Sequence, residues 1–481
     1  MNTGKTILLR HATTAVVWNA SRNRHEYLAD ADIAFRDGNL IFVGRDYPGE
    51  AEIRVDGRGL MAMPGLVNVH CHTADEPLSK GIFDDVGCYA HHGHALYAYG
   101  GLLDSDEAGM LAATRAALCE LALSGVTSLV DLAVPYPGWL EALAASGLRV
   151  WAGPMFREAR WEAGAGGEVR YHWDRERGER GFAGARAIID ELLERPGSLV
   201  SPLVAPAQAD TCSPGLLYRA LDLARERDLP LTVHAAQTMV EFREMLRRHG
   251  TTTVQWLASQ DLLDERVFLG HGIFMDHHRW THLGSTRDLD RVAGRGVGVA
   301  HCPTVFARSA MCLESLGRYR ERGVTLGIGT DTYPMNLLEE MRQAVYLARV
   351  AGGTVFDTRF QDVFDAATVG GAGLLRRPDL GRLAVGCKAD LVLVDLQHPA
   401  MQPVHDPLRS LLVAAAERAV RHVYVDGRPV VWNGEMLHID RAAALAALQT
   451  AQREAVVGVR ARDRQGRGLD EIAPRLLPDA D

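Results

Sequence analysis

Short apolar runs separated by turn signals mark both ends of the chain. Near the N-terminus these runs occupy residues 6–9, 33–35, 40–43 and 52–55, and Asp37-Gly38-Asn39 between two of them is typical of a hairpin turn. Near the C-terminus the runs are 391–394, 422–425 and 429–432, with Asp426-Gly427 and Asn433-Gly434 as turns. We therefore predict β-strands at both ends, which could pair into one small β-sandwich domain.

The middle of the chain has a different rhythm, in which β-branched runs end in polar residues and are followed by helix-like stretches. There are eight such runs: 66–69, 126–131, 148–156, 199–206, 230–234, 267–271, 297–301 and 325–331. The last four end in His234, His271, His301 and Asp331, which are 37, 30 and 30 residues apart, about the length of one βα unit. Eight units in series predict a (β/α)₈ TIM barrel, in which the chemistry lies at the carboxyl ends of the strands.

These patterns predict a particular domain organisation. Residues 1–64 and 381–450 would form the composite β-sandwich, residues 65–380 the catalytic barrel, and residues 451–481 a C-terminal helix or tail, frayed or helical over 466–481. Two insertions at the barrel rim stand out. Residues 73–103 are rich in aromatic residues and histidine and are expected to form a lid, while residues 157–182 carry many charges and glycines and are expected to be a surface loop.

Composition excludes several classes of protein. The 481 residues include 52 basic and 61 acidic side chains, for a net charge of −9, which argues against a basic face for nucleic acid or an anionic membrane. No apolar run is long enough for a transmembrane helix, and the first ten residues are not those of a signal peptide. The seven scattered cysteines form no CxxC pair and favour a reducing, cytoplasmic setting with free thiols. With no basic face, the expected partner is a small uncharged or weakly basic molecule.

The first chemical signal is His70-Cys71-His72. Residues two apart on a strand point the same way, so His70 and His72 can reach one metal ion, while Cys71 faces away and is expected to be buried rather than nucleophilic. In a chain with 19 histidines, this pattern alone is weak evidence for a metal site. His234 and Asp331 at other strand ends strengthen it, although His234 could be a core histidine and Asp331 a helix N-cap.

At this point the sequence resembles the amidohydrolase superfamily, and in particular the branch that contains cytosine and guanine deaminases and s-triazine hydrolases. The matching motifs follow one another along nearly the whole chain. They are Pro64-Gly65-Leu66…His70-Cys71-His72, Ser124-Gly125-Val126-Thr127-Ser128, Thr211-Cys212-Ser213-Pro214, His234, His271, Gly329-Thr330-Asp331, Ala367-Thr368…Gly371-Ala372…Leu375, and Leu380-Gly381-Arg382-Leu383…Gly386-Cys387-Lys388-Ala389-Asp390-Leu391-Val392.

The resemblance implies metal ligands at His70, His72, His234 and Asp331, with His271 beside the reacting water. Binuclear relatives commonly bridge two metals with a carboxylated lysine from the fourth strand, and residues 199–206 contain no lysine. We therefore expect one divalent ion per subunit, with zinc favoured over iron or cobalt. We also expect a homo-oligomer, a dimer or a tetramer.

The chain departs from this branch at Gln237. Related deaminases usually carry a glutamate three residues after the strand-five histidine, where it shuttles protons to the ring and the leaving group. A neutral amide cannot act as an acid or base near neutral pH. Glu241, four residues further on, is either a substitute or, in the favoured interpretation, a surface residue. The fourth-strand loop also lacks the histidine that relatives often carry, and residues 301–304 read His-Cys-Pro-Thr where many relatives have an asparagine-proline-serine pattern.

These features predict a hydrolase that cleaves a non-peptide C–N bond in a small cyclic or aromatic compound. Hydroxide made available by the metal would attack, with His271 and Asp331 as catalytic residues. The departures favour amide, lactam, urea, carbamate or amine-substituted ring substrates. The alternative is a nucleobase-type or s-triazine aminohydrolase, and the remote alternative is a non-catalytic member of the superfamily.

Candidate substrate-binding residues lie on the rim loops. They are Gln237, His301, Phe83 and Tyr89, although His301 could instead serve packing. The cluster His91-His92-Gly93-His94 could hold a second metal, touch substrate or belong to an ordinary surface loop.

Overall fold

A closed parallel barrel forms the centre of the molecule. The computed structural model describes residues 4–164 and 167–477. The barrel strands pair in parallel in the order β11-β8-β7-β6-β16-β15-β14-β13, and bridges Val204–Leu231 and Gln208–His234 close the ring. The predicted (β/α)₈ barrel is thus confirmed. Its strands are β6 (Leu66–Cys71), β7 (Val126–Ala133), β8 (Arg149–Phe156), β11 (Val200–Pro202), β12 (Ala205–Pro206), β13 (Leu231–Ala235), β14 (Val267–His271), β15 (Gly298–His301) and β16 (Leu326–Ile328).

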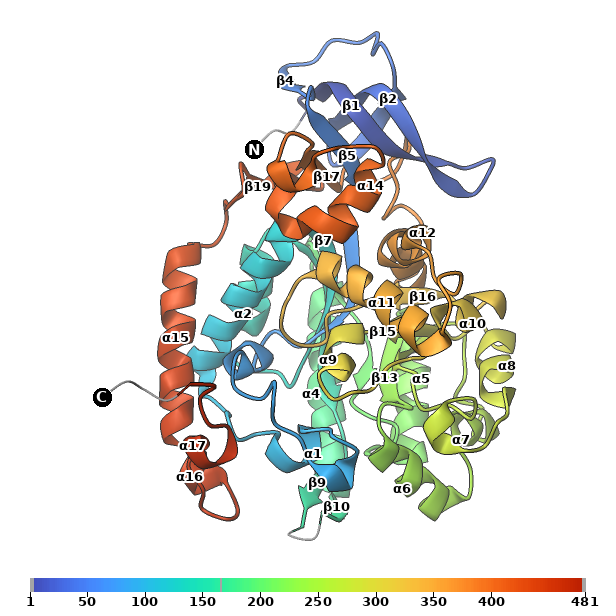
Figure 1. Ribbon diagram of the computed structural model, residues 1–481, viewed down its shortest axis with the longest axis vertical. Helices are drawn as coiled ribbons and strands as arrows, with labels where there is room; N and C mark the ends of the chain where they lie inside the picture. Colours follow the sequence, from blue (N-terminus) through green and yellow to red (C-terminus); the bar gives the residue numbers. More distant parts are fainter. Residues whose placement is uncertain (1–3, 165–166, 478–481) are drawn as a thin grey trace.

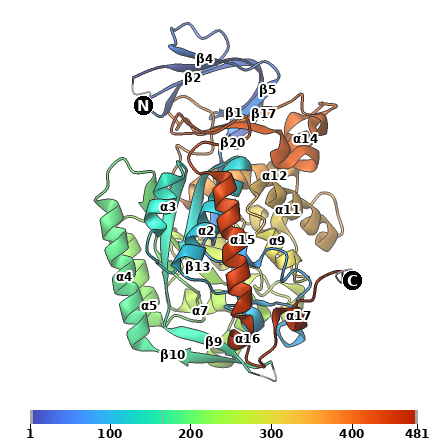
Figure 2. The same ribbon diagram turned by 90° about the vertical axis from the view of Figure 1, so that its left-hand side faces the viewer.

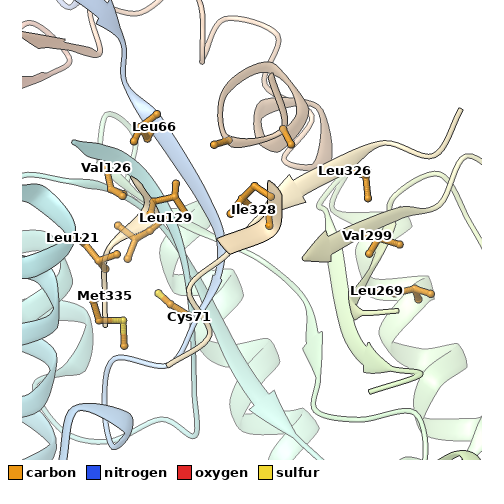
Figure 3. Close-up of a cluster of buried hydrophobic side chains, with 14 of the residues drawn as sticks. Leu66, Cys71, Leu121, Val126, Leu129, Leu269, Val299, Leu326, Ile328 and Met335 are labelled. Atoms are coloured by element: carbon orange, nitrogen blue, oxygen red, sulfur yellow. The ribbon is translucent and has the colours of Figure 1, made fainter. Parts of the chain in front are cut away.

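Strand alternation separates the barrel interior from the shell of helices. On β8, Trp151 and Met155 pack with the interior cluster that includes Leu132 and Leu203, whereas Phe156 packs against Phe182 of the outer helix α4 (Arg175–Leu193). Side chains two apart therefore share a face, as the pleat requires. Figure 3 shows the apolar side chains of neighbouring barrel strands, among them Leu129, Leu269, Val299 and Ile328. The outer helices include α2 (Glu107–Leu123), α5 (Pro214–Glu226), α6 (Met239–His249), α8 (Arg287–Gly294) and α11 (Leu337–Gly352).

Strands from both chain ends share a second sheet, which lies at the top of Figure 1. Its path is β20-β19-β18-β17-β5-β1-β2-β3, with β4 on β1, so β5 joins the N-terminal strands to the C-terminal ones. The expected turn at Asp37-Gly38 connects β2 and β3. The strands are β1 (Ile7–Asn19), β2 (Arg24–Arg36), β3 (Asn39–Gly44), β4 (Ile53–Asp56), β5 (Leu60–Pro64), β17 (Leu391–Asp395), β18 (Val420–Val425), β19 (Arg428–Trp432) and β20 (Glu435–Met436).

Residues 73–103, here called the lid segment, follow β6 and cross the carboxyl mouth of the barrel. The segment holds three short helices, η1 (Glu76–Ser79), η2 (Tyr89–His91) and α1 (Leu96–Tyr99). The Tyr97 hydroxyl is 2.7 Å from the Thr238 hydroxyl in the loop after β13, and the His92 ring contacts Trp280 in the loop after β14. The lid segment therefore touches the loops that follow separate barrel strands.

The second insertion is not the surface loop that its charges and glycines suggest. It forms the antiparallel hairpin β9 (Ala159–Ala163) and β10 (Val169–Trp173), and α4 already begins at Arg175. Alternating polar and bulky residues along both hairpin strands are the physical reason for this difference, because they suit a ribbon with one covered face.

The C-terminal helices pack beside the lid segment, as Figure 2 shows. They are α15 (Arg441–Val457), α16 (Val459–Arg462) and α17 (Leu469–Ile472). Leu102 and Leu103 of the lid segment form one cluster with Val459 and Ile472. Residues 478–481 of the expected tail lie outside the described residues. No helix in the described part of the chain is long and apolar enough to cross a membrane.

Candidate metal centre

The carboxyl ends of four barrel strands bring potential metal ligands together. One ligand atom from each of His70, His234, His271 and Asp331 lies within 4.8 Å of the others, and all four residues are buried. His72 is outside this group but adjacent to it, because its Nε2 atom is 3.4 Å from Asp331 Oδ1 and 3.2 Å from His234 Nε2. The structure thus brings together the four predicted ligands and His271.

The hydrogen bonds of His72 and His234 fix which ring nitrogen carries the proton. His72 Nδ1 lies 2.9 Å from the Leu132 carbonyl oxygen, and His234 Nδ1 lies 2.5 Å from that of Ala207. A carbonyl only accepts, so each Nδ1–H donates and each Nε2 keeps its lone pair. Two lone pairs facing each other at 3.2 Å repel unless a cation lies between them. These residues therefore fit a bound metal ion.

His70 and His271 add two more imidazoles with free nitrogens. Among the described residues, neither ring nitrogen of either side chain has a hydrogen-bond partner, although both rings are at most 1% exposed. Burial lowers the pKa of His70 and holds the pKa of His271 well below its usual value, so both rings are neutral. Neutral imidazole is the form that binds a metal.

Asp331 supplies the negative charge of the group. Its Oδ1 is 3.3 Å from His70 Nε2, and its Oδ2 is 3.9 Å from His271 Nε2. Burial opposes ionisation of this carboxyl, but the surrounding histidines hold its pKa well below the usual value. Three or more imidazoles with one carboxylate suit Zn²⁺ and other divalent transition metals.

The backbone at two of these residues is in a costly conformation. His271 has φ of 85° and Asp331 has φ of 60°, values that residues with a β-carbon rarely adopt. Such a conformation costs about 1–3 kcal/mol and persists only where the surroundings hold it. The hydrogen bond from Asp331 N–H to the His70 carbonyl, 2.9 Å long, is one such restraint.

The loop after β13 carries Gln237, three residues after His234. Gln237 is 9% exposed, and its side-chain amide makes no hydrogen bond with the described residues. Glu241 holds the backbone of this loop, because its carboxylate oxygens accept from Ala236 N–H and Gln237 N–H, each at 2.7 Å. The interpretation of Glu241 as a surface residue is wrong: it is 3% exposed, since it turns back under the loop. Burial and the nearby Asp210 raise the pKa of Glu241 to about 7.

The other predicted site residues lie outside the ligand group. His301 ends β15, is 4% exposed and lies outside the ligand group. Tyr89 is fully exposed, and Phe83 packs with the C-terminal helices. Of the residues that the structure describes, only the group around Asp331 combines three or more possible ligands, so His91, His92 and His94 form no second one. Cys71 is buried, as expected.

The sequence interpretation missed three polar residues at this end of the barrel. Glu340 is fully buried on α11 and accepts a 3.0 Å hydrogen bond from Thr304 N–H, and burial raises its pKa to about 8. Its place on the apolar face of the predicted helix after Asp331 was the available signal. Arg157 follows β8, and His94 lies in the lid segment with a buried Nε2 atom that has no partner among the described residues.

A match to a protein-family model establishes the family of this chain. The model described as "Amidohydrolase family" matches residues 61–430, most of the chain. The chain belongs to the amidohydrolase family. A 5-methylthioadenosine/S-adenosylhomocysteine deaminase of Halobacterium salinarum is 31% identical over 441 residues, which are 90% of this chain and 95% of the relative. A 5'-deoxyadenosine deaminase of Methanosarcina acetivorans is 26% identical and covers 89% of this chain and 94% of its own.

Solved structures of the amidohydrolase fold agree with this assignment. An adenosine deaminase from Xanthomonas campestris with bound zinc has a TM-score of 0.77 at 23% identity, covering 93% of this chain and 98% of its own. An atrazine chlorohydrolase from Arthrobacter aurescens with zinc has a TM-score of 0.79 at 23% identity, covering 93% and 100%. At this identity the likeness shows the fold. Family and relatives together make this amidohydrolase an enzyme that hydrolyses carbon–nitrogen bonds other than peptide bonds.

Proposed function

We propose that this amidohydrolase removes an amine substituent from a small, electron-poor heterocycle, with one divalent metal ion, zinc first, held by His70, His72, His234 and Asp331. The observation that carries the proposal is the pair of unprotonated Nε2 atoms of His72 and His234, 3.2 Å apart beside a carboxylate. The deaminases among its relatives support the choice of an amine leaving group.

The roles of the surrounding residues follow from their atoms. The metal supplies Lewis acidity, which makes water usable as a nucleophile near neutral pH. Asp331 Oδ2, which lies 3.9 Å from His271 Nε2, would accept the proton of that water. The neutral His271 ring, 0% exposed, can donate a hydrogen bond to the negative charge that develops on the substrate.

Gln237 sets the expected substrate class. Its amide can orient a ring nitrogen by hydrogen bonding but cannot carry a proton to it. The favoured substrates are therefore those whose reacting carbon is electrophilic without ring protonation, such as an amino-substituted triazine. A lactam, urea or carbamate carbonyl meets the same condition and is the second candidate.

We further propose the larger organisation expected from the sequence. Residues 1–64 and 381–450 would act as one β-sandwich domain, residues 65–380 as the catalytic barrel and residues 451–481 as a C-terminal element; the shared sheet through β5 supports this. Two exposed apolar residues, Val350 near the end of α11 and Phe356 in the loop after it, support a homo-oligomer. The free cysteines among the described residues support a reducing, cytoplasmic setting.

The test combines metal analysis with a substrate panel. We expect one equivalent of bound metal, lost together with activity in His234→Ala and retained in the matched control His438→Ala, which changes a histidine outside the group. Amino-substituted triazines and pyrimidines, lactams, ureas and carbamates would be scored by mass spectrometry of the products. Release of ammonia or an amine from a triazine or pyrimidine whose ring stays intact supports the proposal, whereas an amine released by cleavage of a urea or carbamate supports the second candidate. A ring-opened acid supports the second candidate, and no metal binding with no turnover of any substrate contradicts both.

A further inference from the structure

Arg157 lies directly after β8, at the carboxyl mouth of the barrel. Phe156 before it packs on α4, and Glu158 after it lies against Gly178 of the same helix. Trp151 and Met155, on the opposite face of β8, pack inside the barrel. Side chains alternate along an extended strand, so Arg157 continues the inward face at the level of the mouth.

The guanidinium group of Arg157 has no anionic partner. Among the described residues it makes no hydrogen bond and no ion pair, and its Cζ atom lies 5.8 Å from the centre of the Trp161 ring, at the outer limit of a cation–π contact. Burial lowers the pKa of Arg157, with Asp210 and Asp75 opposing this from a distance. An arginine nevertheless remains protonated in a protein. A partly buried cation without an anionic partner is costly, and an anionic group of a ligand would remove that cost.

Solvent reaches one side chain beside Arg157 and one side chain at the metal centre. Met155 is partly exposed although it faces the barrel interior, and the His72 side chain is 15% exposed. His72 follows β6, and one strand, β7, separates β6 from β8. Two strand spacings amount to about 10 Å, which one small ring and a substituent can span.

We propose that Arg157 binds an acidic substituent of the substrate, a carboxylate or a deprotonated ring oxygen, while the opposite side of the ring faces the metal ligands. The guanidinium offers two parallel N–H donors that match such a group. This inference rests on the proposed function, because it names the kind of heterocycle that the same site would accept.

A second hydrogen-bond donor at the carboxyl mouth of the barrel, His94, also suits a substrate that carries hydrogen-bond acceptors. His94 Nδ1 accepts a 3.1 Å hydrogen bond from Leu96 N–H, so the proton of this neutral ring is on Nε2. That Nε2–H is buried without a partner in the described part of the chain, and the His94 ring packs on Phe306, which also contacts His271. Arg157 and His94 therefore both present donors, and neither presents an acceptor.

Calorimetric titration with paired probes tests the proposal. The zinc-loaded enzyme would be titrated with orotate and nicotinate, and with their neutral counterparts uracil and nicotinamide. We expect the two carboxylates to bind at least about tenfold more tightly than the neutral probes. We expect this preference to disappear in Arg157→Met, to fall in Arg157→Lys and to weaken as salt is added. Arg160→Met, which removes an exposed cation from the same hairpin, is the matched control and should change binding less than twofold.

The outcomes are decisive in both directions. Equal binding of charged and neutral probes, absence of binding by every probe, or a carboxylate preference that survives in Arg157→Met overturns the proposal. The metal-free enzyme should keep part of the preference, because the carboxylate contacts Arg157 rather than the metal ligands; its complete loss there also overturns it. Because the titration measures binding and the substrate panel measures turnover, this inference can fail while metal-dependent C–N hydrolysis stands, and C–N hydrolysis can fail while this inference stands.

Discussion

Gln237 lies three residues after His234, with its backbone held by Glu241 and its amide free of partners among the described residues. Gln237→Glu would place a carboxyl there without changing the length of the side chain. We expect this variant to deaminate an unactivated aminopyrimidine about tenfold faster or more, since general acid–base catalysis contributes about 10²–10⁴-fold. The rate of an activated triazine should change much less. Rate–pH profiles on both substrates provide the measurement.

A control variant is measured in the same way. Gln449→Glu introduces an exposed carboxyl on α15 and should leave rates and pH dependence as they are. If active Gln237→Glu keeps its rate and pH profile on both substrates, this position does not determine the chemistry.

Glu340 makes the stability of the enzyme depend on pH. Burial raises its pKa to about 8, so the folded state holds a proton that the unfolded state releases near pH 4.5. Since the folded state binds more protons in that window, the free energy of unfolding should fall as pH rises from about 4.5 to about 8, by a few kcal/mol at most. Glu340→Gln mimics the protonated side chain and should remove this slope. Urea unfolding at several pH values measures it, and an unchanged slope in the variant contradicts the prediction.

Metal ligands could be predicted from the sequence where the end of a strand fixed the direction of the side chain. His70, His234 and Asp331 end apolar strands, and the closed barrel brings such ends together. Glu241 was not predictable in the same way, because helical spacing does not reveal that its side chain turns back under the loop, whereas the apolar face of α11 did carry a signal for Glu340. Arg157 was assigned to a loop, although it continues the inward face of β8.

At the scale of elements, the C-terminal helices stabilise the lid segment. Val459 and Ile472 are buried against Leu102 and Leu103, and the Arg462 guanidinium donates to the Asp104 carbonyl at 2.9 Å. A chain ending at Val457 would lose these contacts. We expect hydrogen exchange in residues 76–104 to speed up about tenfold or more, because local opening becomes easier, while the barrel strands stay protected.

A chain ending at Leu477 is the control for this truncation, since it keeps α16 and α17. Mass-spectrometric hydrogen exchange on the two shortened proteins gives the comparison. Unchanged exchange in the lid segment of the shorter chain would show that the barrel loops alone hold it.

The elements themselves were predictable to different degrees. Long β-branched runs predicted the barrel strands, but the fourth is two short pieces, β11 and β12, because Leu203 and Val204 between them hydrogen-bond to different neighbours. The hairpin β9–β10 was hidden by charged residues, which are compatible with an exposed ribbon. The alternation of polar and bulky residues along its two strands was the local signal for this pairing.

At the scale of the whole molecule, a buried ion pair joins the barrel to the shared sheet. Arg149 begins β8, and its guanidinium donates to both carboxylate oxygens of Asp390, at 3.1 and 3.2 Å, just before β17. Asp390 also accepts a 2.7 Å hydrogen bond from Asp426 N–H in the turn between β18 and β19. The side chains of Arg149 and Asp390 are 7% and 3% exposed, so neither charge can be satisfied by water if its partner is removed.

Arg149→Met should therefore lower the free energy of unfolding by about 3–5 kcal/mol, because it leaves the Asp390 carboxylate buried and unpaired. Arg180→Met, which breaks an exposed pair with Glu176, should cost about 1 kcal/mol or less. Replacing both Arg149 and Asp390 with apolar residues should recover much of the loss, since no charge is then buried alone. Urea unfolding of the four proteins measures these differences. Equal losses in Arg149→Met and Arg180→Met would mean that the barrel and the sheet are held together by apolar packing, and that this ion pair contributes little to their junction.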